Sequence, residues 1–554
     1  MSHPSHLEII PLGGLGQFGM NLMVYRWGDE CVVVDAGVAF PHTDQLGVDL
    51  IRPDLSFLER CGHIHGLVLS HGHEDHIGAV PFVLERHDVP VFAGPYTSGL
   101  VQRRLSEAPV AVAARFEPLF DDGRTVRIGP FDVETIPVAH SIPEARMIVL
   151  RTPAGTVLHT ADFKLGRPED REPTALARLD RLGGEGVLVL LADSTNADRP
   201  GCTPGERVVT DGLDAVIAQA SARVLVTTFS SHLHRIGELA RTAERHGRKI
   251  ALAGTAILAH VENAERVGLI RWPAGVRVSV QDAMKLPRNR VVIVTGGSQA
   301  EPTSSLMRIA HGRHREIRLD PDDLIVHSAR TIPGNERRIA RMMNLLLRRG
   351  ARLITPAEAP VHVSGHPSAD ELRLLLRVVK PRHMIPIHGE YRQLAAHAEL
   401  AREQGLGAAH VLVAESGDRI AVSSDAMRIV DRTPLAPVPI TADRKDLDRG
   451  VLGDRRRLAS EGVLVPVVLL DRSSGTAVLE GGFAARGFVP APLRGGGPWH
   501  PGAERAVRAW LSDTAEEDRS DPERLAAGVE TVLRRYLRQN GHGRPLIVPI
   551  VVEV

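Results

Sequence analysis

The sequence is poor in cysteine and in aromatic residues, and it has no excess of charge of either sign. Its 554 residues include three cysteines, Cys31, Cys61 and Cys202. Three cysteines argue against a disulfide framework and against a metal site built from thiolates. Aromatic residues make up 4% of the chain, so widespread stacking on nucleic-acid bases is not expected. The formal net charge is zero, which leaves the question of a polyanionic partner open.

Long hydrophobic runs are also missing. No run reaches the roughly 20 apolar residues that a membrane span needs, and the opening segment MSHPSHLEIIPLGG has no basic stretch followed by an apolar one. We therefore expect no secretory signal, no membrane partner and a cytoplasmic location. A composition with 43% hydrophobic and 24% charged residues is typical of a globular protein, and this length predicts about two to four domains.

Short apolar runs separated by turn signals dominate residues 1–204. The runs CVVVDAG, GTVLHTAD and GVLVLLADS are examples, and they predict strands, several of them fully buried. Helical periodicity appears in IGAVPFVLERH, directly after His76. Strands with helices between them favour a layered α/β sandwich.

The pattern changes at about residue 205. Residues 205–349 alternate regularly between helix and strand, which predicts a parallel sheet. Residues 350–430 return to strand and helix pairs and would complete the first domain. A proline-rich and then charged stretch at 431–455 predicts a linker, and residues 456–554 predict a small α/β domain.

The segment SHGHEDHIGA gathers five potential metal ligands in six residues. His71, His73, Asp75 and His76 stand at positions i, i+2, i+4 and i+5, a spacing that one helical face cannot present. A loop between a strand and a helix can present them, with two imidazoles on one cation and Asp75 with His76 on a second. Histidine nitrogen and carboxylate oxygen suit Zn²⁺ or Mn²⁺, and the lack of thiolates favours a hydrolytic site.

Further ligands are expected singly at strand ends. His140 closes FDVETIPVAH, Asp162 closes TVLHTAD, and His388 closes HMIPIH. In each case a buried apolar run ends in a side chain that binds metals, so these three residues are the candidates to complete a two-metal site.

These motifs carry a family resemblance. SHGHEDHIGA, with Asp35 in VVVDAG before it and His140 and Asp162 after it, resembles the metallo-β-lactamase superfamily. The segments TTFSSHLHRI, PGNE, VHVSGH and IPIHGEYR are similar to those of the β-CASP nucleases, and within them to the bacterial ribonuclease J family. The resemblance covers nearly the whole chain. It implies a metallo-β-lactamase αββα sandwich with an inserted β-CASP parallel-sheet α/β domain and a small C-terminal α/β domain.

The resemblance also implies two divalent metal ions, Zn²⁺ in the first place and Mn²⁺ as the alternative. The implied ligands are His71, His73 and His140 for one ion and Asp75, His76 and His388 for the other, with Asp162 bridging them. Asp35 would orient a ligand from behind. The implied catalytic residues are Asp75, His366 and Asp35, with His366 assisting the leaving oxygen.

The implied substrate is single-stranded RNA. The segments expected to hold its phosphates, including a 5′-monophosphate, are Ser231 and His232 on one side and His362, Val363, Ser364, Gly365 and His366 on the other. Hydroxide formed at the two metal ions would attack phosphorus in line. The expected activity is a 5′-to-3′ exoribonuclease, with endonuclease cleavage as a second mode, in RNA maturation and decay. A homodimer or homotetramer through the C-terminal domain and partners in an RNA-degradation complex are also implied.

Two segments depart from the family pattern, and both lie in the substrate-holding domain. Residues 297–302 read GSQAEP where relatives often have GSQGEP, and residues 328–331 read SART where a serine-rich string is usual. These differences affect substrate preference more than reaction type. Arginines are frequent between residues 308 and 349, where they would form either a basic wall around a phosphate-bearing substrate or a solvated helix face.

Several alternatives remain at this stage. GLGQFG matches a dinucleotide fingerprint, but the runs after it predict strands rather than the required helix, so a tight hairpin is favoured. A metallo-hydrolase of a small ester, thioester or lactone would share the histidine cluster but would not need residues 205–349. A non-catalytic RNA-binding scaffold should have lost a ligand, and all seven are present. DNA stays open as a substrate because no residue visibly reads a 2′-hydroxyl.

Overall fold

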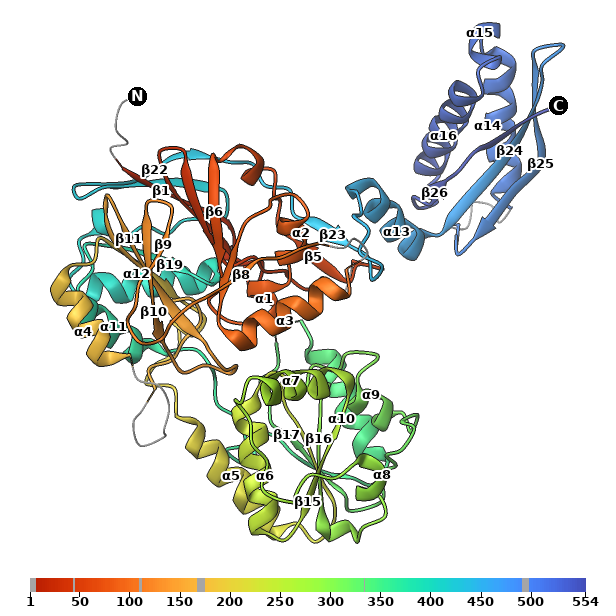
Figure 1. The fold of residues 1–554 in the computed structure, drawn as a ribbon. Helices are drawn as coiled ribbons and strands as arrows, with labels where there is room; N and C mark the ends of the chain where they lie inside the picture. Colours follow the sequence, from red (N-terminus) through yellow and green to blue (C-terminus); the bar gives the residue numbers. More distant parts are fainter. Residues whose placement is uncertain (1–5, 43–44, 109–111, 167–174, 333, 491–497) are drawn as a thin grey trace. The chain divides into compact units, whose positions relative to one another are not determined.

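The structure is a computed structural model that describes residues 6–42, 45–108, 112–166, 175–332, 334–490 and 498–554. Contacts divide the chain into two compact units (Figure 1). The first comprises Met1–Phe40 with Leu50–Val438, and the second comprises Pro41–Asp49 with Pro439–Val554. Among the described residues, no helix combines the length and the apolar character needed to cross a membrane.

Two sheets form the centre of the first unit. The first sheet has the order β22 (Met427–Arg432), β21 (Asp418–Val422), β1 (Leu7–Gly13), β3 (Leu22–Trp27), β4 (Glu30–Val34), β6 (His63–Val68), β7 (Val91–Ala93) and β8 (Phe116–Pro118). The second has the order β19 (His383–Ile387), β13 (Val189–Asp193), β12 (Gly155–His159), β11 (Arg146–Thr152), β10 (Phe131–Pro137) and β9 (Val126–Ile128).

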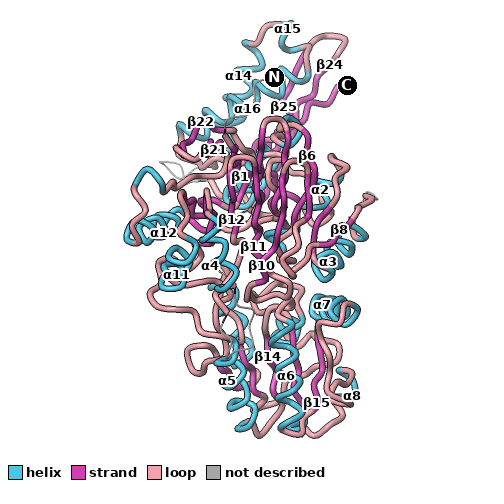
Figure 2. The backbone as a smooth tube through the Cα atoms, turned by 60° about the vertical axis from the view of Figure 1, so that its left-hand side comes forward, coloured by secondary structure: helices cyan, strands magenta, loops and turns pink. Residues whose placement is uncertain are grey.

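Alternating side chains explain why these sheets stack. Ile9 of β1 and Ile148 of β11 belong to the apolar core between the sheets, whereas Ile10 and Met147 face the helices outside, as the period of two in a strand requires. The helices that cover the first sheet are α1 (Glu74–Ile77), α2 (Val80–Leu84) and α3 (Pro95–Ser106). Those that cover the second are α4 (Leu176–Glu185), α11 (Ala369–Val379) and α12 (Tyr391–Glu403). The predicted αββα sandwich is confirmed (Figure 2).

A five-stranded parallel sheet forms the inserted domain. Its order is β15 (Lys249–Ala253), β16 (Val291–Thr295), β14 (Val224–Thr227), β17 (Leu324–His327) and β18 (Arg352–Ile354). Its two faces are covered by α5 (Glu206–Gln219), α6 (Leu233–Arg245) and α7 (Thr255–Arg266), and by α8 (Val280–Ala283), α9 (Ser305–Ala310) and α10 (Glu336–Arg348). The segments 229–232, 297–299 and 328–330 follow the carboxyl ends of three strands and therefore share one edge of the sheet.

The glycines of GLGQFG form a turn. Gly14, Gly16 and Gly19 have φ angles of 83°, 76° and 84°, which glycine adopts without strain. The chain then continues into β3, which pairs antiparallel with β1. A dinucleotide site would need a helix at this point, so the hairpin interpretation holds.

The second unit contains a four-stranded sheet and helices. Its elements are α13 (Arg449–Glu461), β24 (Val463–Asp471), β25 (Thr476–Arg486), α14 (His500–Asp513), α15 (Glu516–Arg519), α16 (Pro522–Gln539), β26 (Leu546–Ile547) and β27 (Ile550–Glu553). Leu464, Val468 and Leu470 of β24 pack under α14 and α16. The predicted boundary at residues 455–456 falls inside α13, whose first turn is capped by the Asp448 carboxylate accepting from the Val451 amide at 2.9 Å.

Candidate metal centre and active site

The histidine cluster lies in the connection from β6 to α1. His73 is the N-cap residue of α1, while Asp75 and His76 lie within the helix. His71 and His76 are almost completely buried. The loop and the single helical turn point the ligands in different directions, so two groups form rather than one.

The first group contains three histidines and one carboxylate. His73 Nδ1 lies 3.1 Å from both His71 Nε2 and His140 Nε2. The Asp162 Oδ2 atom lies 3.7 Å from His71 Nε2 and 3.6 Å from His140 Nε2. Ligand atoms about 2.1 Å from a tetrahedral ion stand about 3.4 Å apart, so these spacings are compatible with a divalent cation held by all four side chains.

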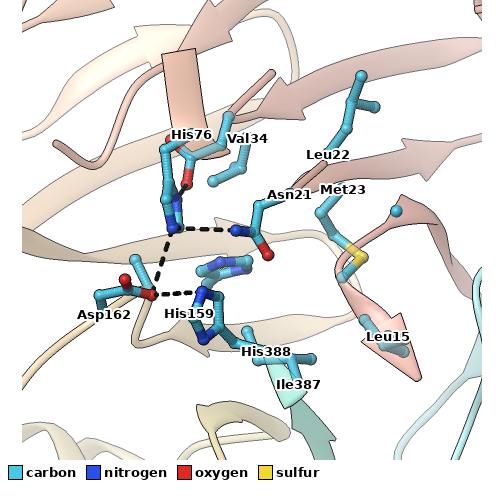
Figure 3. A pocket seen from close by; sticks show the side chains of 13 residues that line it. Leu15, Asn21, Leu22, Met23, Val34, His76, His159, Asp162, Ile387 and His388 are labelled. Carbon is cyan, nitrogen blue, oxygen red and sulfur yellow. Dashed lines mark hydrogen bonds and ion pairs between the residues drawn. The ribbon is translucent and has the colours of Figure 1, made fainter. Parts of the chain in front are cut away.

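The second group shares Asp162. Its Oδ1 atom lies 3.3 Å from His76 Nε2 and 3.3 Å from His388 Nε2. The Asp75 Oδ2 atom lies 3.7 Å from His76 Nε2 and 3.3 Å from His388 Nε2. The donor atoms in each of these two groups lie within 4.8 Å of one another, so all seven sequence candidates converge on one centre. Figure 3 shows His76, Asp162 and His388 turned toward one another.

Hydrogen bonds on the remote side of each ring leave one nitrogen of every histidine free to face the centre. Ser70 Oγ donates to Asp35 Oδ2 at 2.8 Å and therefore accepts from His71 Nδ1 at 3.0 Å. In the same way Thr195 Oγ1 donates to Asp193 and accepts from His388 Nδ1 at 2.8 Å. A neutral ring that donates on one side presents a lone pair on the other, as a metal ligand must.

The remaining rings follow the same rule. His76 Nδ1 donates to Asp35 Oδ2 at 2.7 Å, and His140 Nδ1 donates to the Gly365 carbonyl at 2.7 Å. His73 is reversed, because its Nε2 meets Ser231 Oγ at 3.2 Å and its Nδ1 faces the group. Asp35 has a left-handed φ of 61° at the end of β4, which aims its carboxylate at Ser70 and His76. The donor set, its spacing and its tautomers therefore fit two divalent cations.

The two groups differ in charge. Burial lowers the pKa of His71 and His140 well below the ordinary value and that of His73 to about 4, and neighbouring histidines add to the effect on the first two. Burial acts in the same direction on His76 and His388, but nearby carboxylates, chiefly Asp162, outweigh it and raise the pKa of both rings well above the ordinary value.

A third group adjoins the second one. His366 Nδ1 donates to Asp193 Oδ2 at 2.7 Å, and Asp193 Oδ1 accepts from the Thr195 amide and hydroxyl at 2.9 and 2.7 Å. Asp193 is fully buried at the end of β13, and the histidines beside it hold its pKa below the ordinary value despite burial. One carboxylate thus orients His366 directly and His388 through Thr195.

The predicted phosphate-holding residues divide into two sets. Ser231, Ser364, Gly365 and His366 lie around the centre: Ser231 and Gly365 bond to its histidines, and Asn196 Nδ2 donates to Ser364 Oγ at 3.0 Å and to the His366 carbonyl at 3.2 Å. His232, His362 and Val363 lie deeper. Their substrate contacts stay a prediction.

A buried ion pair holds this deeper set. Arg235 donates to Glu206 Oε1 at 2.7 Å, and His232 Nε2 donates to the same oxygen at 3.2 Å. His362 Nδ1 accepts from Arg235 at 3.3 Å, and burial lowers its pKa to about 2. Val363 packs in the apolar core. This network ties the segment before α6 to the segment before His366.

Sequence reasoning missed four supporting residues, Asn21, Ser70, Asp193 and Thr195. Asn21 Nδ2 donates to the Asp75 carbonyl at 3.0 Å and lies 3.0 Å from His76 Nε2. It also lines a cavity of about 10 Å³ beside the second group, at the lower limit of the space that one water molecule needs. Asp193 had a usable signal, because it closes the buried run VLLAD just as Asp162 closes its own strand.

The fold and the two-group centre define a metal-dependent hydrolase of the metallo-β-lactamase superfamily. Protein-family models that match four segments of the chain agree with this class. Residues 15–200 match the metallo-β-lactamase superfamily, 221–346 the ribonuclease J β-CASP domain, 359–414 the Zn-dependent metallo-hydrolase RNA specificity domain, and 450–554 the ribonuclease J C-terminal domain.

Comparison with known proteins identifies the family within this superfamily. The chain is 36% identical to ribonuclease J of Mycobacterium tuberculosis over 99% of its own length and 97% of the relative's. It is 35% identical to ribonuclease J of Thermus thermophilus, covering 99% and 95%. The chain belongs to the ribonuclease J family and is a metal-dependent hydrolytic ribonuclease that binds RNA.

A solved structure shares the fold. A protein of unknown function from Enterococcus faecalis V583 aligns with a TM-score of 0.54 and 15% identity, covering 75% of this chain and 100% of that one. At this identity the likeness concerns the fold alone, and it agrees with the sandwich described above.

Proposed function

We propose that the chain degrades single-stranded RNA from the 5′ end, prefers a 5′-monophosphate, and uses two divalent ions with Zn²⁺ as the first choice. Endonuclease cleavage is a second mode of the same centre. The observation that supports this most directly is the pair of tetrahedrally spaced groups sharing Asp162, with His366 and Asp193 beside them. His71, His73 and His140 would hold one ion, and Asp75, His76 and His388 the other.

Cations bound there would lower the pKa of water and neutralise charge on the phosphate. Residues of the chain itself would supply the proton for the leaving group. Asp193 holds the Nδ1 proton of His366, so His366 Nε2 is the atom that can deliver a proton to the leaving 3′-oxygen. Hydrolysis that leaves a 5′-phosphate on the downstream fragment makes that fragment the next substrate, which is why a phosphate-holding segment at Ser364 to His366 suits a 5′-to-3′ direction.

The test is a cleavage assay on metal-reconstituted protein. RNAs of one sequence bearing a 5′-monophosphate, a 5′-hydroxyl or a 5′-triphosphate are followed by product length over time. We expect mononucleotides from the 5′ end, released fastest from the monophosphate, and no products with His388→Ala. His63→Ala, which changes an exposed histidine of β6, is the matched control. Protein with two bound metals that cleaves none of these RNAs, or that cleaves only from the 3′ end, contradicts the proposal.

We also propose that the C-terminal domain joins copies of the chain into a dimer or tetramer. The side of its sheet away from α14 and α16 carries an apolar strip: Leu469 pairs with Val478 on one side and Val552 on the other, so all three share that face. Val478 and Val552 are 42% and 40% exposed. A second copy would cover this surface and remove it from water.

Light scattering of the purified chain tests this proposal. Val552→Asp should yield monomers, because a charge on that face opposes burial. Val208→Asp changes an equally exposed valine on α5 and should leave the mass unchanged. An unchanged oligomer with Val552→Asp contradicts the proposed interface. The cytoplasmic location and partners in an RNA-degradation complex stay predictions.

A further inference from the structure

We propose that Arg330 is a specificity-determining residue that binds an RNA phosphate next to the cleavage site. The inference rests on the proposed RNA hydrolysis and adds a named contact to it. Arg330 lies in the segment after β17, at the edge of the parallel sheet that also carries segments 229–232 and 297–299. It is one of the positions where the sequence departs from the serine-rich string of relatives.

The backbone around Arg330 is held in place. Gln299 Nε2 donates to the Arg330 carbonyl at 2.8 Å, and Gln299 Oε1 accepts from the Ile332 amide at 2.9 Å. Both bonds fix the loop against the neighbouring segment of the same sheet edge. The guanidinium group therefore starts from a defined position rather than from a loose surface loop.

The side chain of Arg330 reaches toward the phosphate-holding segment. Its Nη1 donates to Asn196 Oδ1 at 2.9 Å. The Nδ2 atom of the same Asn196 donates to Ser364 Oγ and to the His366 carbonyl. One amide side chain thus connects the guanidinium to the segment that carries the predicted leaving-group acid.

Arg330 has no ion-pair partner among the described residues, and the Asp198 carboxylate opposes the burial of its charge only in part. No described Asp or Glu forms an ion pair with it, and the nearby Asp198 pairs with Arg392. Arg199 adds a second positive charge close by. Burial lowers the pKa of Arg330 most, and the charge of Arg199 lowers it further. A half-buried cation whose side-chain hydrogen bond goes to a neutral amide is incompletely compensated electrostatically.

A phosphate meets these requirements best. The guanidinium fork bonds phosphate oxygens in pairs, and a bound anion would complete the charge compensation that Asp198 supplies only in part. Other arginines of the predicted basic wall lie in a different environment, because Arg337, Arg338 and Arg341 are exposed on α10. Arg330 is the member of that wall that the structure connects to Ser364 and His366.

The test uses single-turnover cleavage by the metal-reconstituted full chain in excess over RNA, repeated at several salt concentrations. Arg330→Gln should raise the half-saturating protein concentration by about tenfold, with the maximal rate within about twofold. It should also flatten the plot of log affinity against log salt by about 0.7, the value for one lost phosphate contact on a single strand. Arg330→Lys should restore most of the slope.

Arg290→Gln is the matched control, because it removes the same charge from an exposed position just before the opposite, amino end of β16. Loss confined to 5′-monophosphate RNA assigns the contact to the terminal phosphate, and equal loss with 5′-hydroxyl RNA assigns it to an internal diester. An unchanged salt slope overturns the inference, even if affinity falls, because a role through Asn196 alone would not move it. If the unmodified chain cleaves no RNA, the proposed function fails instead.

Discussion

The two halves of the metal centre have similar donor spacings, but the pKa values of their histidines shift in opposite directions. The half built from His71, His73 and His140 draws one carboxylate from Asp162 and otherwise consists of neutral imidazoles. The half built from Asp75, His76 and His388 is ringed by carboxylates that raise the pKa of both histidines. The first half is therefore prepared for a cation, whereas the second holds protons until a cation replaces them.

This difference indicates that the two halves have different roles. A neutral three-histidine set binds an ion without proton exchange and suits a tightly held site. The second half adjoins Asp193 and His366, so its proton and charge balance is coupled to the groups that would handle the leaving oxygen. Four predictions follow from this contrast, beginning with the largest expected effect.

Asp162→Ala should disrupt both halves of the centre, because it removes the residue that they share. We expect loss of bound metal from both halves and a fall in RNA cleavage of about 10⁴-fold or more, since both proposed cations would act on the same phosphate. Metal analysis and initial rates measure the two effects. Asp211→Ala, on the exposed face of α5, is the control. Full metal content in Asp162→Ala would contradict the bridging role.

His366→Ala should separate chemistry from metal binding. Removal of the group proposed to protonate the leaving oxygen is expected to slow cleavage by about 100- to 1,000-fold, with both halves still occupied. Parallel measurement of metal content and single-turnover rate checks this. If metal is lost together with activity, His366 is a ligand rather than the acid.

Asp35→Ala should weaken the second half selectively. Asp35 accepts from His76 Nδ1 directly and reaches His71 only through Ser70. Loss of such a partner costs about 10- to 100-fold in metal affinity. Anomalous diffraction from crystals grown at limiting metal would show lower occupancy beside His76 than beside His73. Equal loss in both halves would refute the selective effect.

Acidification should empty the second half first. Because the raised pKa values of His76 and His388 keep these rings protonated at neutral pH in the metal-free chain, metal binding there must release protons and must weaken as pH falls. His73, with a pKa of about 4, stays neutral to much lower pH. Calorimetry in buffers of different protonation enthalpy should detect proton release for one ion only. Equal release for both ions would remove the contrast.

The sequence predicted the layers, and it singled out the seven residues that the structure gathers at one centre, because both leave local patterns. Residues along a strand alternate between the face of Ile9, which lies between the sheets, and the face of Ile10, which lies against the helices. The ligands either end buried runs or cluster in one loop. The supporting residues leave no such pattern: Thr195 and Ser70 act only through partners far away in the chain. The burial of His232 and His362 depends on Glu206 and Arg235, which only the folded chain brings together.

One departure from the family pattern has a consequence for the backbone. Ala300, which stands where relatives often have glycine, has a left-handed φ of 56° and is buried. Glycine adopts that conformation without strain, whereas alanine does so at a cost. The segment that holds Arg330 through Gln299 is thus adjacent to a strained residue, a feature that sequence alone could not reveal.

The most direct test of the account is anomalous diffraction from crystals of the metal-reconstituted chain at neutral pH. The account predicts two peaks, one among His71, His73 and His140 and the other among Asp75, His76 and His388, with Asp162 bonded to both. A single peak, or two peaks that do not share Asp162, would contradict the two-metal centre.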